Sequence, residues 1–213
     1  CPSGTMTNQI AIKVHTQPLD EVICDHYAHI YQYESAGYAF NSGVSMNLIQ
    51  GTHGMITAEQ IGAVIKPVHD WLPRTRLVVL ENTCNKGGGS FYTLEEIKPI
   101  QQVCQERGLK LHLDGARLFN ALVETKDSTQ DVGAHFDSIS ICLSKGLGAP
   151  VGSLLLGDHE FIRQARRFRK VMGGGMRQAG FLAAAATYAL DHQVERLKTD
   201  NDRAKKIGAL LET

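Results

Sequence analysis

The sequence has no excess of charge of either sign. Its 22 lysine and arginine residues balance 22 aspartate and glutamate residues, so the formal net charge is zero. Binding to nucleic acid or to a membrane surface through bulk charge needs a basic excess. No apolar run reaches the roughly 18 residues of a membrane-spanning helix. We therefore expect no nucleic-acid partner, no membrane partner and, because CPSGTMTNQI is unlike a signal peptide, no leader at the start of the sequence.

Paired cysteines and metal-binding motifs are also missing. The five cysteines are odd in number, no two have CxxC spacing, and they lie at positions 1, 24, 84, 104 and 142. Unpaired thiols are typical of a reducing compartment, so we expect a cytoplasmic protein. The nine histidines form no HExxH motif and no Cys/His quartet. We expect no metal site.

The sequence contains strand-like and helix-like segments in alternation. Two helices are predicted to begin with capping boxes, one at Thr57 and Gln60 and one at Thr93 and Glu96. We expect strands at 21–25, 76–82, 110–114, 136–143 and 152–157, and helices at 57–68, 93–108, 158–170, 176–192 and 193–212. This order predicts an α/β fold with a mostly parallel sheet covered by helices.

Polar clusters follow three of these strands, at 81–85, 114–117 and 144–145. Parallel sheets bind ligands beyond the carboxyl ends of their strands, so these clusters are candidate site residues. Lys145 stands at such an end among small residues. A solvent-exposed lysine in a turn is the common alternative, but a lysine held in a site of this kind can form a Schiff base with a carbonyl group.

Asp114 ends an apolar strand, in the stretch LHLDGAR. It is either a helix cap or an anion aimed at a cationic ring nitrogen, as pyridoxal phosphate requires. Arg117, three residues further on, suits a carboxylate clamp or is a surface arginine at a helix start.

Two further stretches fit a cofactor site. Residues 3–11, SGTMTNQIA, predict a helix whose free N–H groups bind a phosphate together with the Ser3 and Thr5 hydroxyls, although similar caps begin many helices. Residues 26–37 place histidine among aromatic residues, which fits stacking on a flat cofactor or packing in the core. The sequence thus contains a phosphate-binding helix start, a ring-facing aspartate and a Schiff-base lysine in this order, a combination that is hard to obtain by chance.

This set resembles that of the low-specificity L-threonine aldolases, which are fold-type-I pyridoxal-phosphate enzymes of the β-eliminating lyase group. The stretches that carry the resemblance cover nearly the whole chain and are PSGTMTN, AHIYQYESAG, VVLENT, HLDGARLFNA, CLSKGLGAPVGS, SLLLG and GGGMRQAGFLAAA. The resemblance implies cleavage of L-threonine or L-allo-threonine to glycine and acetaldehyde, and hence a role in glycine supply and threonine breakdown.

The resemblance also implies a role for each of several residues. Lys145 holds pyridoxal 5'-phosphate covalently, and Asp114 pairs with the ring nitrogen. His29 stacks on the ring and acts in acid–base steps. Gly4 and Thr5 bind the phosphate.

Four more residues receive roles from the same resemblance. Arg117 binds the substrate carboxylate, and Glu34 orders water or a proton relay. Lys170 and Arg177 lie near the phosphate of a neighbouring subunit's site, which implies a homo-oligomer, either a dimer or a tetramer.

Two features depart from the family. Cys84 stands where the family commonly has a histidine that faces the substrate β-hydroxyl, so an aldolase for phenylserine or 3-hydroxyaspartate, or another β-eliminating lyase, stays open. A non-catalytic homologue is the other alternative. The sequence also starts inside the phosphate-binding turn. We expect an incomplete large cofactor-binding domain over 1–190 and the start of a small C-terminal domain over 191–213.

Overall fold

The computed structural model describes residues 1–211. Its strands are β1 Asp20–Asp25, β2 Ser45–Ile49, β3 Arg74–Glu81, β4 Lys110–Gly115, β5 Ser138–Cys142 and β6 Ser153–Gly157. Its helices are α1 Gly4–His15, α2 His29–Gln32, the π-helical turn η1 Tyr38–Ser42, α3 Ala58–Val64, α4 Leu94–Arg107, α5 Leu118–Thr125, α6 Thr129–Gly133, α7 His159–Val171, α8 Gly180–His192 and α9 Leu197–Leu211. No helix of this part of the chain is long and apolar enough to cross a membrane.

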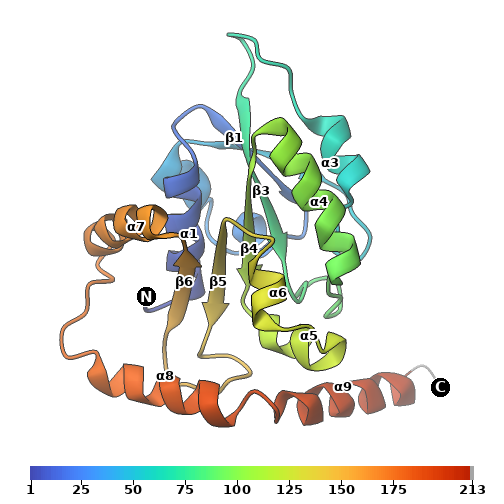
Figure 1. Ribbon diagram of the computed structural model, residues 1–213, viewed down its shortest axis with the longest axis vertical. Helices are drawn as coiled ribbons and strands as arrows, with labels where there is room; N and C mark the ends of the chain where they lie inside the picture. Colours follow the sequence, from blue (N-terminus) through green and yellow to red (C-terminus); the bar gives the residue numbers. More distant parts are fainter. Residues whose placement is uncertain (212–213) are drawn as a thin grey trace.

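The six strands form one sheet in the order β2-β1-β3-β4-β5-β6. The pairs among the first five are parallel, and β6 is antiparallel to β5. Helices α1 and α7 cover one face, and α3 and α4 cover the other (Figure 1). Helices α8 and α9 cross the end of the sheet at which β5 finishes, at the bottom of the view. The α/β prediction is confirmed.

The two faces of the central strands differ in chemistry. Successive side chains of a strand point to opposite faces. On β4, Leu111 and Leu113 join the apolar core that packs under α4, while His112 and Asp114 lie on the α1 side. Strand β5 continues the pattern with polar side chains toward α1. The sheet therefore has a layer of polar side chains that is buried between the strands and α1.

Local signals fixed the helix ends correctly in the middle of the chain. Both predicted capping boxes are present, at Thr57 and at Thr93. Helix α4 ends at Gly108, whose φ of 64° is the left-handed conformation that glycine adopts readily.

Several expectations were incomplete or wrong. Strand β2, helices α2, α5 and α6 and the turn η1 were not predicted, and the helix expected over 57–68 ends at Val64. Helix α8 begins at Gly180 and not at 176, because residues 172–179 form a turn in which Gly173 has a φ of 84°. The last helix begins at Leu197 and not at 193. The predicted helix end at 212 lies outside the described residues, and the domain boundary at 190 stays a prediction.

Candidate active site

Five of the residues that receive a role from the resemblance line one hollow of about 230 Å³, and Ser3 lines it as well. The five are Gly4, Thr5, His29, Asp114 and Lys145. They come from the start of α1, the start of α2, the end of β4 and the turn after β5. The hollow therefore lies at the carboxyl ends of the central strands, where the sequence pattern placed it.

The start of α1 offers free backbone donors to this hollow. The Ser3 hydroxyl accepts from the Met6 amide at 3.2 Å and so caps the helix. The amides of Gly4 and Thr5 donate to no other residue within 1–211. Helix α1 passes so close to β5 that a Cβ on Gly4 would lie 2.6 Å from Cys142 Sγ. Unpaired amides at a helix start bind phosphate well.

Asp114 provides a buried anion at the floor of the hollow. It is 2% exposed, and Oδ2 accepts from Asn8 Nδ2 at 2.7 Å while Oδ1 accepts from the Ala116 amide at 3.2 Å. Burial, followed by the nearby Glu81 and Glu34 carboxylates, raises the pKa of Asp114 to about 6. A cation beside this carboxylate would relieve that cost, and a protonated pyridine ring is such a cation.

His29 is held by Glu34. Its Nδ1 lies 3.0 Å from Glu34 Oε1, and its backbone amide donates to Glu81 Oε2 at 2.8 Å. Gln9 donates to the other oxygen of Glu34 at 2.6 Å. The hydrogen bond to Glu34 raises the pKa of His29 against the opposing effect of burial. The ring is thereby fixed at the wall of the hollow, with Nε2 unpartnered among the residues described.

Lys145 reaches the same hollow from the turn after β5. Its backbone oxygen accepts from the Gly148 amide at 2.9 Å, which closes the turn. Its side-chain amine makes no hydrogen bond or ion pair with any residue of the described chain. An unpaired amine that lines a hollow is available to bond with a carbonyl carbon.

Arg117 and Cys84 do not line this hollow. Arg117 lies in a neighbouring one of about 260 Å³ and donates through Nη1 to Asn85 Oδ1 at 3.2 Å. Cys84 is 2% exposed, and its Sγ lies 3.1 Å from the backbone oxygen of Glu81 and 3.4 Å from that of Gly54. Burial raises the pKa of Cys84 to about 12, so the thiol keeps its proton at neutral pH. Their substrate contacts stay predictions.

Lys170 and Arg177 lie away from the hollow. Lys170 is exposed near the end of α7, where its side chain packs over Gly175. Arg177 is exposed in the turn before α8. Their expected place at a neighbouring subunit's site stays a prediction.

Sequence reasoning gave no individual role to two buried residues of the site, although Glu81 lies in the candidate cluster at 81–85. Asn8 lies between Asp114 and Glu34 and donates to both. Glu81 holds the start of α2 through the His29 amide. Helical spacing could have revealed Asn8, since it stands four residues after Gly4 and so faces the same side of α1.

The side chains of His29, Glu34 and Asp114 also bring one ligand atom each within 4.8 Å of one another. This is a spacing that a metal ion could use. However, Asn8 and Gln9 already donate to these carboxylates. The arrangement, with a free amine and a phosphate-binding helix start beside it, suits an organic phosphate with a cationic ring better.

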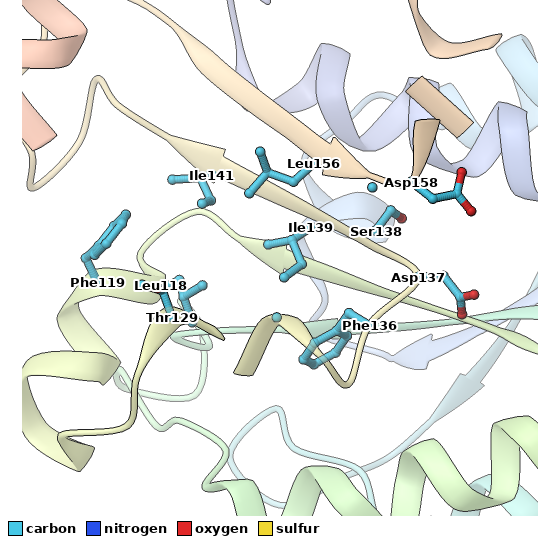
Figure 2. Close-up of a pocket in the computed structure, with 12 residues that line it drawn as sticks. Leu118, Phe119, Thr129, Phe136, Asp137, Ser138, Ile139, Ile141, Leu156 and Asp158 are labelled. Carbon is cyan, nitrogen blue, oxygen red and sulfur yellow. The ribbon is translucent and has the colours of Figure 1, made fainter. Parts of the chain in front are cut away.

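A larger hollow of about 500 Å³ lies beside β5 and β6, on the face of the sheet that points away from α1. Figure 2 shows that its wall is mostly apolar, with Ile139, Ile141 and Leu156 on the strands and Asp137 and Asp158 at one end. Both acids have structural partners, because Asp137 accepts from Lys110 and Asp158 caps α7. This hollow brings together no set of catalytic groups.

Comparison with known proteins identifies the family of this chain. The profile of the beta-eliminating lyase family matches residues 1–213. A low-specificity L-threonine aldolase of Candida albicans is 40% identical over an alignment of 213 positions, which covers 98% of this chain and 56% of that protein. The Escherichia coli low specificity L-threonine aldolase is 42% identical over 204 residues, or 95% of this chain and 60% of that protein.

A solved structure supports the fold. The threonine aldolase of Leishmania major superposes with a TM-score of 0.87 at 26% identity, over 99% of this chain and 62% of that one. The chain thus spans between about half and two thirds of the length of these proteins. The fold is that of the fold-type-I pyridoxal-phosphate enzymes, and pyridoxal phosphate is the cofactor of the family. This chain belongs to the beta-eliminating lyase family.

Proposed function

We propose that this protein is a pyridoxal-phosphate-dependent aldolase that cleaves L-threonine and L-allo-threonine to glycine and acetaldehyde. The observation that carries the proposal is the meeting of Lys145, Asp114, His29 and the start of α1 in one hollow. These groups supply an amine, an anion, a ring and a phosphate site, which are what this cofactor needs. The relatives named as low-specificity L-threonine aldolases support the choice of substrate.

Each group has a stated part in holding the cofactor. Lys145 Nζ would form the covalent bond, because it has no partner in the described chain. The amides of Gly4 and Thr5 would bind the phosphate, and Asp114 would accept from the ring nitrogen. When bound, the cofactor supplies the sink for the electrons released as the Cα–Cβ bond breaks.

His29 is the proposed base for the β-hydroxyl proton. Glu34 accepts a hydrogen bond from Nδ1 of His29. The neutral ring therefore carries its proton on Nδ1, and Nε2 is left as an acceptor. Glu34 also raises the pKa of His29, which strengthens that acceptor. Glu34 therefore acts through His29, which gives a specific form to its expected role in a proton relay.

The remaining roles rest on the family resemblance. Arg117 would bind the substrate carboxylate, and Cys84 would influence the preference between the two threonine diastereomers. Lys170 and Arg177 would complete the phosphate site of a second subunit in a cytoplasmic homo-oligomer.

An acetaldehyde assay tests the proposal. The protein with pyridoxal phosphate is given L-threonine or L-allo-threonine, and acetaldehyde is measured by coupled reduction. We expect release by the wild type and by Lys98→Ala, a control at an exposed lysine on α4, and none by a folded Lys145→Ala variant. Turnover by Lys145→Ala would overturn the lysine assignment. Cofactor binding without acetaldehyde, but with cleavage of phenylserine or 3-hydroxyaspartate, would overturn the choice of substrate.

A further inference from the structure

The two carboxylates of the site share one amide. Asn8 Nδ2 lies 2.7 Å from Asp114 Oδ2 and 2.9 Å from Glu34 Oε1. Both carboxylates can only accept, so the amide nitrogen, with its two protons, must face them. Asn8 is 1% exposed, so its amide depends on these protein partners. Its carbonyl oxygen therefore points the other way, toward His112.

His112 lies behind Asn8 and is fully buried. Its Nε2 is 3.3 Å from Asn8 Oδ1, which can only accept, so Nε2 must carry a proton. Burial lowers the pKa of His112 to about 3, so the ring is neutral and has one proton. Its Nδ1 is then bare and accepts from the Ser138 hydroxyl at 2.8 Å.

The chain of donors continues outward from Ser138. Its hydroxyl proton is committed to His112, so its oxygen accepts from His15 Nε2 at 2.7 Å. Every hydrogen bond from His15 through Ser138, His112 and Asn8 is then donated in one direction. The direction is toward Asp114 and Glu34, which are the anions of the site.

We propose that Asn8 and His112 are positioning residues of the cofactor site, which hold the Asp114 carboxylate ionised and aligned for the ring nitrogen. The identity of that ring rests on the proposed function, while the hydrogen-bond chain does not. If the Asn8 amide were reversed, its oxygen would lie 2.7 Å from a carboxylate oxygen, and the two acceptors would repel. The proton on His112 Nε2 adds to this preference, because it donates to Asn8 Oδ1 only in the observed orientation.

The charge of Asp114 supports this assignment. Burial and the neighbouring carboxylates favour its protonated form, and the hydrogen bond from Asn8 opposes them. A protonated Asp114 could not stabilise a cationic ring. The hydrogen bond from Asn8 therefore helps to keep Asp114 ionised, which is the form that can stabilise a cationic ring.

Ser138 gives the sharpest test, because it lies on the far side of His112 from Asp114. Nδ1 of His112 is also 3.1 Å from the Ser138 backbone oxygen, which only accepts. In a Ser138→Ala variant this oxygen is the partner that remains for Nδ1. The ring proton should then move to Nδ1, leaving Nε2 bare against Asn8 Oδ1 and releasing the amide. Ser140→Ala is the matched control, since Ser140 is equally buried on β5 but pairs with Thr7 at 2.5 Å.

The experiment has two readouts. In cofactor-free protein, ¹⁵N NMR of the imidazoles should find the His112 proton on Nε2 in the wild type and in Ser140→Ala, and on Nδ1 in Ser138→Ala. Pyridoxal phosphate should bind roughly tenfold more weakly to Ser138→Ala and His112→Leu than to the wild type, since a hydrogen bond to a charged group is lost. His112→Gln should restore part of the affinity, because its amide can donate to Asn8.

Two results would overturn the proposal. One is an Nδ1 proton on His112 in the wild type. The other is unchanged cofactor affinity in a Ser138→Ala variant whose ring proton has moved. The first concerns the wild type and the second a folded Ser138→Ala variant, so a failure of His112→Leu to fold leaves the test intact. A protein that binds no pyridoxal phosphate at all would instead refute the proposed function, and the NMR result would still decide the hydrogen-bond chain.

Discussion

The cofactor-free protein should be destabilised by ionisation of Asp114. This carboxyl group has a pKa raised from 3.8 to about 6 because it is buried next to Glu81 and Glu34. A raised pKa means that the folded state binds the proton more tightly than the unfolded state. The stabilising contribution is therefore complete below pH 3.8 and is lost as the pH rises through about 6. This change in pKa corresponds to about 3 kcal/mol.

Asp114→Asn removes this titration. In urea denaturation of the cofactor-free proteins between pH 4.5 and 8, the variant should gain stability relative to the wild type, by up to about 3 kcal/mol at the alkaline end. Glu59→Gln, at an exposed carboxylate in the first turn of α3, should show no such trend. Pyridoxal phosphate should stabilise the wild type far more than Asp114→Asn. A stability difference that does not vary with pH would refute the argument that burial destabilises the ionised form of Asp114.

Three further predictions concern residues in and around the site. Glu34→Gln should lower the pKa of His29, so the acid limb of the pH profile of kcat/KM should move to lower pH; an unmoved limb would contradict His29 as the base. Gly4→Ala should destabilise the fold by about 1–3 kcal/mol in thermal unfolding, because its Cβ meets Cys142 Sγ. Adding Cys142→Ala should restore much of that stability. Cys84→His should change the ratio of rates on L-threonine and L-allo-threonine, and an equal ratio would place Cys84 outside the substrate's reach.

Much of the fold could be predicted because its signals are local. The caps at Thr57 and Thr93 and the glycine at 108 fix helix ends through hydrogen bonds within one turn. Strand β2 was missed because it is a partly exposed edge strand without a continuous apolar run. The glycine loop at 173–175 was predicted correctly, but residues 176–179 were predicted as the first turn of a helix that begins only at Gly180.

The site was predicted in part for a similar reason. Lys145 and Asp114 stand at strand ends, and the sheet brings such ends together whatever the details of packing. Asn8 and His112 act through side chains on two different elements, so no single stretch reveals their contact. The alternation on β4 could have shown that His112 and Asp114 face the same side. Arg117 stands only three residues after Asp114, yet the start of α5 turns it toward a different hollow.

The central claim is that Lys145 carries the cofactor in this hollow. The most direct measurement is borohydride reduction of the protein loaded with pyridoxal phosphate, followed by mass spectrometry of its peptides. The account predicts a single reduced pyridoxyl group, on Lys145, and its absence from a folded Lys145→Ala variant. A label on another lysine, or no label on a folded protein that binds the cofactor, would contradict it.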